Sequence, residues 1–125
     1  MEPVSLFDLA TRQSQWLAVR QSAVAGNIAN ANTPGYTAKD VEPFEKVLDR
    51  AAVSLRATQA GHLGGAGDAA FKIKSEEFTG SIMPSKNTVV LEDQLMKAGE
   101  VRRSFELNTA IVKAFHSMMM MAVKT

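Results

Sequence analysis

The chain has 125 residues, enough for one small domain or one elongated helical subunit. Its 14 basic and 13 acidic residues leave a formal net charge of +1, which gives no basis for a nucleic-acid partner or for binding to an acidic membrane. The absence of cysteine excludes disulfides, thiol catalysis and cysteine metal sites. Hydrophobic residues make up 46% of the chain but aromatic residues only 6%, a balance that favours long helices over a dense globular core.

The N-terminal segment predicts a long amphipathic helix. Ser5 is a suitable N-cap residue, and apolar residues then recur at helical spacings of three, four and seven. This stripe comprises Leu6, Ala10, Leu17, Val24, Ile28 and Ala31. The first residues have no positive cluster followed by an unbroken apolar run, so we expect no cleaved signal peptide and no membrane insertion.

A turn is expected to end this helix. The α-helical region is disfavoured for Thr33 because it precedes a proline, which predicts a helix end at about Asn32. Pro34 and Gly35 are typical of the two central positions of a type II turn. Three asparagines precede the turn, although asparagine is unfavourable inside helices: Asn27, Asn30 and Asn32. They are interpreted either as capping residues of the helix end or as polar contacts that the protein requires.

Residues 37–87 are predicted to form a weakly structured middle segment. Pro43 fits the first position of a short helix near 43–56. The glycine-rich stretch 57–70 has too few apolar residues to offset the entropy of ordering and is expected to be mobile, and a brief strand is expected after it at Phe71–Lys74. The chain is thereby divided into an N-terminal helix with its turn (1–36), the middle segment (37–87) and a C-terminal helix (88–125).

The C-terminal segment carries the strongest periodic pattern. One row of residues at every seventh position is entirely apolar: Leu91, Ala98, Phe105, Val112 and Met119. A second row, three residues later, is partly polar: Gln94, Val101, Asn108, Phe115 and Ala122. Such heptad rows predict helices that pack side by side at shallow angles. We expect the apolar row to pack against Leu17, Val24 and Ile28 of the first helix and against neighbouring molecules.

The predicted fold is mainly α, with long N- and C-terminal helices that pack as a coiled-coil-like pair around a flexible middle. A single pair of helices buries too small a fraction of its surface for robust stability, so we expect assembly with other helices to complete the structure. The run Met118–Met121 covers the whole circumference of the last helix. It is interpreted either as an apolar helix end or as an end that neighbouring subunits bury on all sides.

No catalytic, cofactor or metal site is expected. His62 lies in the glycine-rich stretch and His116 among apolar residues, and neither has a second ligand at metal-binding spacing. Glu76 and Glu77 are adjacent and would point to opposite faces of an extended segment, which makes them a poor acid and base pair. The sequence therefore gives no support for an enzyme.

The segment Asn27–Tyr36 reads Asn-Ile-Ala-Asn-Ala-Asn-Thr-Pro-Gly-Tyr and resembles a signature of bacterial flagellar axial proteins, the rod, hook and hook-associated subunits. Asn87–Met96 and Arg103–Asn108 are similar to two segments of the C-terminal helix of rod subunits, with Val90 and Phe105 as mild departures. The resemblance implies an assembly motif that comprises Asn27, Ile28, Asn30, Asn32, Thr33, Pro34, Gly35 and Tyr36. Its asparagines would make polar contacts between packed subunits.

The resemblance also implies a function. It implies a structural subunit of the proximal rod, since the chain lacks the large insertion of hook and distal-rod subunits. The terminal helices of many copies would form a tube that transmits torque across the periplasm and carries exported subunits, and the chain would itself be exported without a cleaved signal. Implied partners are further copies, other rod proteins, a membrane-ring or rod adaptor and export-gate proteins. A helical adaptor or export chaperone of the same secretion system is the alternative.

Overall fold

The computed structural model describes residues 3–54, 71–76, 80 and 83–124. The elements, in order, are helix α1 (Pro3–Ala29), strand β1 (Lys39–Val41), helix α2 (Phe44–Ser54), strand β2 (Ile73–Ser75) and helix α3 (Leu91–Val123). The predicted fold class is confirmed: two long terminal helices pack against each other, and the middle carries a short helix and a small sheet. The expected mobile segment 57–70, including His62, lies outside the described residues.

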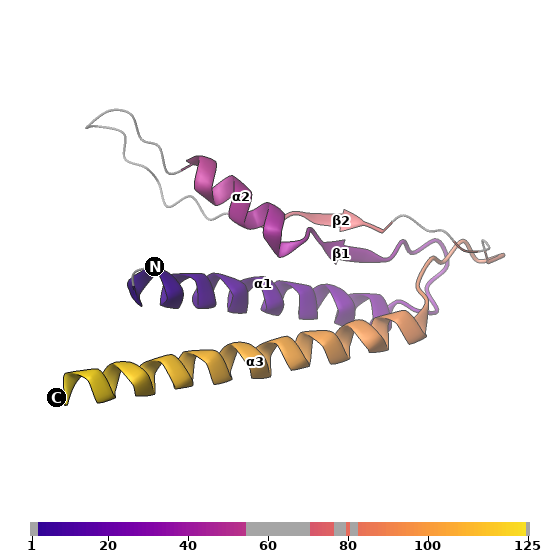
Figure 1. Ribbon diagram of the computed structural model, residues 1–125. Coiled ribbons are helices and arrows are strands. Elements are labelled where there is room, and N and C mark those ends of the chain that lie inside the picture. Colours follow the sequence, from indigo (N-terminus) through magenta and orange to yellow (C-terminus); the bar gives the residue numbers. More distant parts are fainter. Residues whose placement is uncertain (1–2, 55–70, 77–79, 81–82, 125) are drawn as a thin grey trace.

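Helices α1 and α3 lie side by side and run in opposite directions, so both termini are at the same end of the molecule (Figure 1). At about 1.5 Å per residue, the 33 residues of α3 span roughly 50 Å. On the other side of α1 lie β1, α2 and β2, which together we call the arm (Figure 1). Helix α1 is therefore the central element, with α3 on one side and the arm on the other.

The helix boundaries differ slightly from those predicted. Helix α1 begins at Pro3 rather than Ser5, because the fixed φ of proline suits the first helical position. It ends at Ala29 rather than Asn32, and the intervening residues form successive turns. Helix α3 starts after Val90, whose backbone is extended and whose side chain makes no capping hydrogen bond. The acidic side chains of Glu92 and Asp93 in its first turn instead stabilise the helix start by interacting with the positive end of the helix dipole.

The buried seam between the two helices contains three residues of the partly polar row of α3, whereas the residues of the apolar row, expected to pack against α1 and against neighbouring molecules, are half-buried or exposed in the single chain. Leu17 and Val24 of α1 are 0% and 2% exposed, as expected for core residues. The buried residues of α3 are Gln94, Val101 and Asn108, whereas Leu91 of the apolar row is 43% exposed. Gln94 and Asn108 can be buried because α1 supplies hydrogen-bond partners for both side chains.

The two strands form an antiparallel pair in which Lys39 is opposite Ser75 and Val41 is opposite Ile73. The second strand therefore begins two residues later than the predicted Phe71–Lys74 segment. The arm is fixed to α1 by Trp16, whose ring lies 5.7 Å from that of Phe44 and whose indole N–H donates to the carbonyl of Glu42 (2.8 Å).

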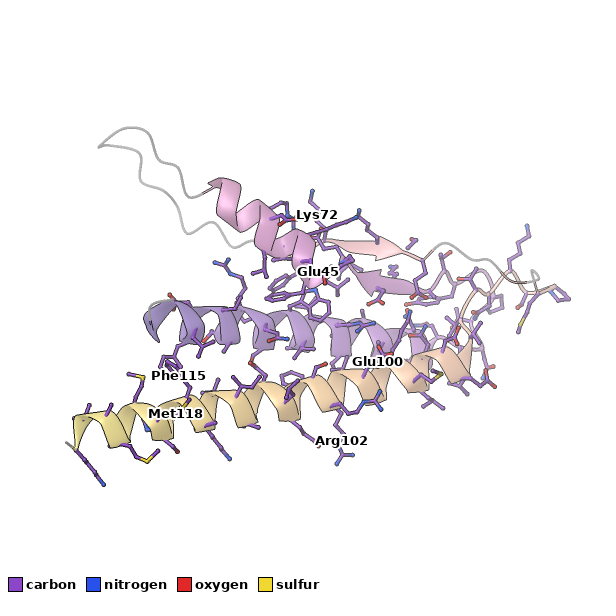
Figure 2. The ribbon with its side chains drawn as sticks, viewed as in Figure 1. Glu45, Lys72, Glu100, Arg102, Phe115 and Met118 are labelled. Carbon is purple, nitrogen blue, oxygen red and sulfur yellow. The ribbon has the colours of Figure 1, made fainter. Side chains whose placement is uncertain are left out.

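The end of the helix pair that carries the termini is closed by two aromatic rings. Phe7 and Phe115 meet edge to face, with 5.6 Å between ring centroids, and Figure 2 shows Phe115 between the two helices. Such a pair contributes about 0.5–1.5 kcal/mol beyond its burial. Beyond Phe115 the methionines of the run Met118–Met121 are 36–63% exposed, so this end of α3 extends past the core of the single chain.

Candidate functional site at the helix joint

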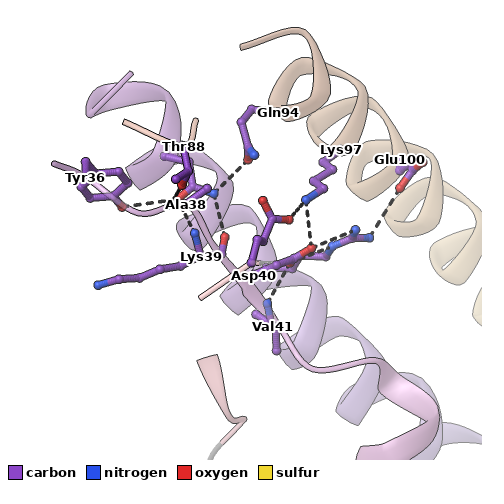
Figure 3. Close-up of polar contacts among 12 residues, drawn as sticks. Tyr36, Ala38, Lys39, Asp40, Val41, Thr88, Gln94, Lys97 and Glu100 are labelled. Carbon is purple, nitrogen blue, oxygen red and sulfur yellow. Dashed lines mark hydrogen bonds and ion pairs between the residues drawn. The ribbon is translucent and has the colours of Figure 1, made fainter. Parts of the chain in front are cut away.

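The side chain of Asn27 joins three elements. It is fully buried, and its amide nitrogen donates to the carbonyl of Lys39 (2.7 Å) and to Oε1 of Gln94 (2.9 Å). Its amide oxygen accepts from the backbone N–H of Lys39 (3.0 Å) and from the hydroxyl of Tyr36 (3.3 Å). All four hydrogen-bonding positions of the amide are used. Asn27 therefore connects the end of α1 to the first strand and to α3, and Figure 3 shows this network with Tyr36, Lys39 and Gln94 labelled.

Asn87, in the loop before α3, closes the end of α1. Its amide nitrogen lies within hydrogen-bond distance of three carbonyls, those of Asn30 (2.9 Å), Ala31 (3.0 Å) and Thr33 (2.8 Å). Its amide oxygen accepts from the backbone N–H of Val89 (2.8 Å). The carbonyls of Asn30 and Thr33 also accept from the backbone N–H groups of Thr33 and Tyr36, so the amide of Asn87 adds a second donor to each of them and joins the turns after α1 to the loop before α3.

The predicted turn is present. The N–H of Tyr36 bonds to the carbonyl of Thr33 (3.3 Å), and Gly35 has φ of +74°, as the third position of a type II turn requires. The turn is attached to the segment before α3, since the N–H of Gly35 donates to the carbonyl of Ser85 (2.8 Å) and the N–H of Thr88 donates to that of Tyr36 (3.1 Å). The chain thus leaves α1 at a direction fixed by the C-terminal segment.

A cluster of charges holds the arm against both helices. Asp40 of β1 lies 3.3 Å from Nε of Arg20 on α1 and 3.4 Å from Nζ of Lys97 on α3. Lys97 also pairs with Glu76 at the end of β2, and Arg20 lies 3.6 Å from Glu100 of α3. Four of these side chains are only 19–28% exposed, so the pairs are screened less than surface pairs. Figure 3 shows Asp40, Lys97 and Glu100 in this arrangement.

A second buried amide sets the alignment of the two helices further along the pair. Asn108 of α3 donates to the carbonyl of Ala10 (3.1 Å) and to Oγ of Ser14 (2.7 Å) on α1. A buried polar residue at a core position favours one register, because any axial slip would leave the amide without partners. Together with Asn27 and Gln94, Asn108 fixes α1 and α3 at two points along their length.

Glu42 anchors the arm internally. The carboxylate is buried, pairs with Arg50 of α2 and accepts from the N–H of Lys72 (3.2 Å). Burial alone raises the pKa of this carboxyl, but the hydrogen bond from Lys72 and the charge of Arg50 outweigh it and hold the pKa below the ordinary value. The ionised form is therefore the form that the fold requires.

The structure places the predicted motif residues in two environments. Asn27 lies in the interior and bonds within the chain, which differs from the contact between subunits that was expected of it. Asn30 also bonds locally, to the carbonyl of Gly26 (2.8 Å) and to the Thr33 hydroxyl (3.1 Å), and Ile28 and Tyr36 are half-buried. The exposed motif residues are Asn32, Thr33, Pro34 and Gly35. These four are the most accessible residues of the motif to another molecule.

The predicted packing residues also divide. Leu17, Val24 and Asn108 are buried; Ala98, Phe105, Val112 and Phe115 are half-buried; Leu91 and Met119 are exposed. Two residues of the joint, Asn87 and Gln94, had not been assigned a role from the sequence. For Gln94 the available signal was a polar residue at a heptad position, whereas Asn87 lies in the polar stretch Ser85–Thr88, where nothing in the local pattern distinguishes it.

Within the described part of the chain there is no group of three or more acidic, histidine or cysteine side chains that could hold a metal ion. None of the described helices is long and apolar enough to cross a membrane. The fold and the joint instead define an elongated helical structural subunit: two antiparallel helices pinned by buried amides, with an arm locked to them by a charge cluster.

The comparisons with known proteins agree with this class. A model of the flagella basal body rod protein family matches residues 11–37, which include most of α1 and the turn. The chain is also similar to "Flagellar basal body rod protein FlgB" of Agrobacterium fabrum (strain C58), with 43% identity over 129 residues that cover 99% of this chain and 96% of the relative. The chain therefore belongs to the flagellar basal body rod proteins.

Membership in this family establishes a structural rod subunit of the bacterial flagellum, situated in the basal body and assembled with other rod components. It is not an enzyme, and the alternative of an adaptor or export chaperone is not favoured. The sequence signature that indicated the family coincides with the joint, where the end of α1, the turn and the start of α3 are bonded together.

Proposed function

We propose that the chain is a subunit of the proximal rod that polymerises through α1 and α3 into a tube, which transmits torque and lets exported subunits pass. The observation that carries this proposal is the exposure of α3. Of its 33 residues only three are buried in the single chain, while apolar side chains including Leu95, Met96, Leu107, Ile111 and Val123 are 46–80% exposed. Large exposed apolar surfaces of this kind mark contact sites for other molecules.

The partners of the proposed rod subunit are further copies, other rod proteins, and an adaptor and export-gate proteins at the base of the rod. The exposed tip of the joint, Asn32–Gly35, and the exposed methionines of the C-terminal end are at opposite ends of the helix pair. A subunit with contact surfaces at both ends and along α3 fits a position between neighbours above, below and beside it. The proposed location is the periplasmic part of the basal body, reached by export without a cleaved signal.

A motility experiment tests this function. In a strain that lacks the gene, the unaltered chain should restore basal bodies with a rod, whereas Phe105→Asp should leave basal bodies that stop at the membrane ring. Phe105 is half-buried beside α1, and a charge there disfavours packing against an apolar neighbour. Gln15→Asp, at an exposed position of α1, is the matched control and should swim normally. Normal swimming of the Phe105→Asp strain with normal chain levels would contradict the proposal.

A further inference from the structure

One edge of the two-stranded sheet is closed by a side chain of α1. Successive residues of a strand direct their backbone N–H and carbonyl groups alternately to its two sides. At the two ends of β1, the carbonyl of Ala38 and the N–H of Glu42 bond to the second strand, so the backbone groups of Lys39 point to the opposite side. There Asn27 donates to the Lys39 carbonyl (2.7 Å) and accepts from the Lys39 N–H (3.0 Å). The amide of Asn27 thus takes the place of a neighbouring strand.

The opposite edge of the sheet runs along β2. At the two ends of β2, the carbonyl of Lys72 and the N–H of Glu76 bond to the first strand. By the same alternation, Ile73 and Ser75 direct their backbone groups away from β1. Figure 1 shows β2 as the outer strand, with β1 between it and α1. In the part of the chain that the structure describes, β2 pairs with no strand other than β1, so its outer edge is open to a further strand.

The side chains along this open edge combine an apolar residue with positive charge. Ile73 is 53% exposed, and Lys72 and Lys74 on either side of it are exposed as well. Neither lysine forms an ion pair with another described residue, and the carboxylates in and beside the two strands are paired with other cations: Asp40, Glu42 and Glu76. Lys72 also attracts Glu42, but the guanidinium of Arg50 already pairs with that carboxylate. The edge therefore carries surplus positive charge on both sides of an apolar side chain.

A second copy of the same edge is a poor partner for β2. Antiparallel pairing of two β2 strands about Ile73 places Lys72 opposite Lys74, and pairing about Lys74 places this lysine opposite itself. Like charges directly opposite each other destabilise a strand pair, and lysines on an exposed strand oppose pairing between identical edges. The same two charges attract a strand that carries acidic residues at the facing positions.

We propose that the open edge of β2 binds an extended segment of a different protein, in which acidic residues alternate with apolar ones. The backbone groups of Ile73 and Ser75 bond to the added strand, as main-chain groups do wherever a peptide extends a sheet. Its acidic residues lie opposite Lys72 and Lys74, and an apolar residue between them packs beside Ile73, because alternate side chains of a strand share one face. This inference concerns the arm and does not rest on polymerisation through α1 and α3.

Amide NMR spectra of the isotope-labelled full chain test this assignment. The probe is the peptide acetyl-Glu-Val-Glu-Val-Glu-amide, and each of two control peptides differs from it in one property: lysine in place of glutamate, or methylated backbone nitrogens. We expect saturable shifts at Ile73 and Ser75 with the acidic probe. Both controls should bind at least about tenfold more weakly, since one repels the lysines and the other cannot donate to the strand. Equal binding of either control, or no shift at the edge, would overturn the proposal.

Two substitutions of Ser75 test the edge from the side of the chain. Ser75→Pro removes the outward N–H and leaves the bonds to β1 in place, because an edge strand tolerates proline where the N–H faces away from the sheet. It should weaken binding of the acidic probe about tenfold, whereas Ser75→Ala keeps the N–H and should bind like the unaltered chain. Unchanged amide signals of Ala38 and Lys39 show that the sheet persists in both variants. Binding that Ser75→Pro leaves intact would contradict pairing at this edge.

Removal of the two charges tests the selection without a proline. A chain with both Lys72→Gln and Lys74→Gln should bind the acidic and the basic peptide about equally, because both lysine side chains are exposed and their charges set the preference. A retained preference for the acidic peptide would overturn the role of the lysines. Shifts at Ile73 and Ser75 that grow with the concentration of the chain alone would show a second copy at the edge and would also overturn the proposal. The motility experiment judges the rod function separately from all of these outcomes.

Discussion

The side-chain nitrogen of Asn27 lies 2.9 Å from Oε1 of Gln94, a buried hydrogen bond between residues 67 positions apart in the sequence. Asn27 belongs to the segment that marks the family, and Gln94 belongs to the C-terminal helix. Their contact shows that the asparagine-rich signature holds the two terminal helices of one chain together at the point where the arm departs. An assembling subunit needs this joint to be fixed before its outer surfaces can meet neighbours in a defined geometry.

Asn27→Ala should lower the free energy of unfolding by at least about 2 kcal/mol, because it leaves the buried amide of Gln94 and the backbone groups of Lys39 without partners. Urea unfolding followed by circular dichroism measures this loss. Asn32→Ala is the matched control: Asn32 is exposed, and its replacement should change stability by less than about 0.5 kcal/mol. Equal losses in the two variants would contradict the assignment of Asn27 as the centre of the joint.

Asn108 and Ser14 should be energetically coupled. A double-mutant cycle with Asn108→Ala and Ser14→Ala should give an interaction energy of about 0.5–1.5 kcal/mol, since each substitution removes one partner of the hydrogen bond between the two side chains. Thr109 is next to Asn108 but exposed, and Thr109→Ala with Ser14→Ala should be additive. Additivity of the first pair would mean that this hydrogen bond does not contribute to the alignment of α1 and α3.

Substitution by alanine should change the stability of the fold in opposite directions at two glycines, Gly35 and Gly99. Gly35→Ala should destabilise the chain by about 1 kcal/mol, because φ of +74° is strained for any residue with a Cβ. Gly99→Ala should stabilise it by up to about 1 kcal/mol, because the position lies inside α3 and an added Cβ meets nothing within 4 Å. The shift of the melting temperature in each variant gives the sign directly. A stabilising Gly35→Ala would exclude the turn geometry described here.

Glu42 should make stability depend on acid pH. Because the pKa of its carboxyl is lowered in the folded chain, the ionised group stabilises the fold above its ordinary pKa of about 4.3, and this contribution is lost as the pH falls through the lower folded value. The melting temperature of Glu42→Gln should therefore be below that of the unaltered chain at pH 7, and the difference should shrink as the pH approaches 3. Glu45→Gln, at an exposed position of the same arm, should show no such trend. A difference that stays constant from pH 7 to pH 3 would contradict the role of the charge.

The charge cluster should make attachment of the arm sensitive to salt. Asp40→Asn removes the carboxylate that faces both Arg20 and Lys97, and hydrogen exchange of the β1 and β2 amides should quicken in low salt. The unaltered chain should lose protection of these amides as salt rises, by an amount equivalent to about 1 kcal/mol or less, whereas Asp40→Asn should respond less. Glu106→Gln removes one side of an exposed pair with Arg102 and should leave the arm amides unchanged. Identical salt responses in all three chains would show that the cluster does not hold the arm.

The sequence alone predicted the elements that depend on local pattern. These local patterns are the apolar stripe of α1, the heptad rows of α3 and the turn signal at Thr33-Pro34-Gly35. The structure contains both helices and the turn. The end of α1 lies a few residues earlier than predicted, and the turns after Ala29 are held by the amide of Asn87, which donates to the carbonyls of Asn30 and Ala31. These hydrogen bonds come from a distant segment and leave no trace in the local sequence.

The choice between the two heptad rows could not be made from hydrophobicity. By composition the apolar row, with Leu91 and Phe105, is the better core, yet Gln94 and Asn108 are the residues buried against α1. Their burial costs little only because Asn27, Ser14 and the carbonyl of Ala10 lie opposite them. Such complementarity exists only once the helices are paired.

The sequence by itself thus determined the helices, the turn that separates them and the family to which the chain belongs, since these follow from residue spacing and from a contiguous motif. The tertiary structure alone decided that Asn27 faces inward to Gln94 and that Gln94, Val101 and Asn108 of the partly polar row are buried against α1. It also decided that apolar Leu107 and Ile111 are exposed. The physical reason is that a buried amide is stable only opposite a matching donor or acceptor, and those partners come from segments far apart in the sequence.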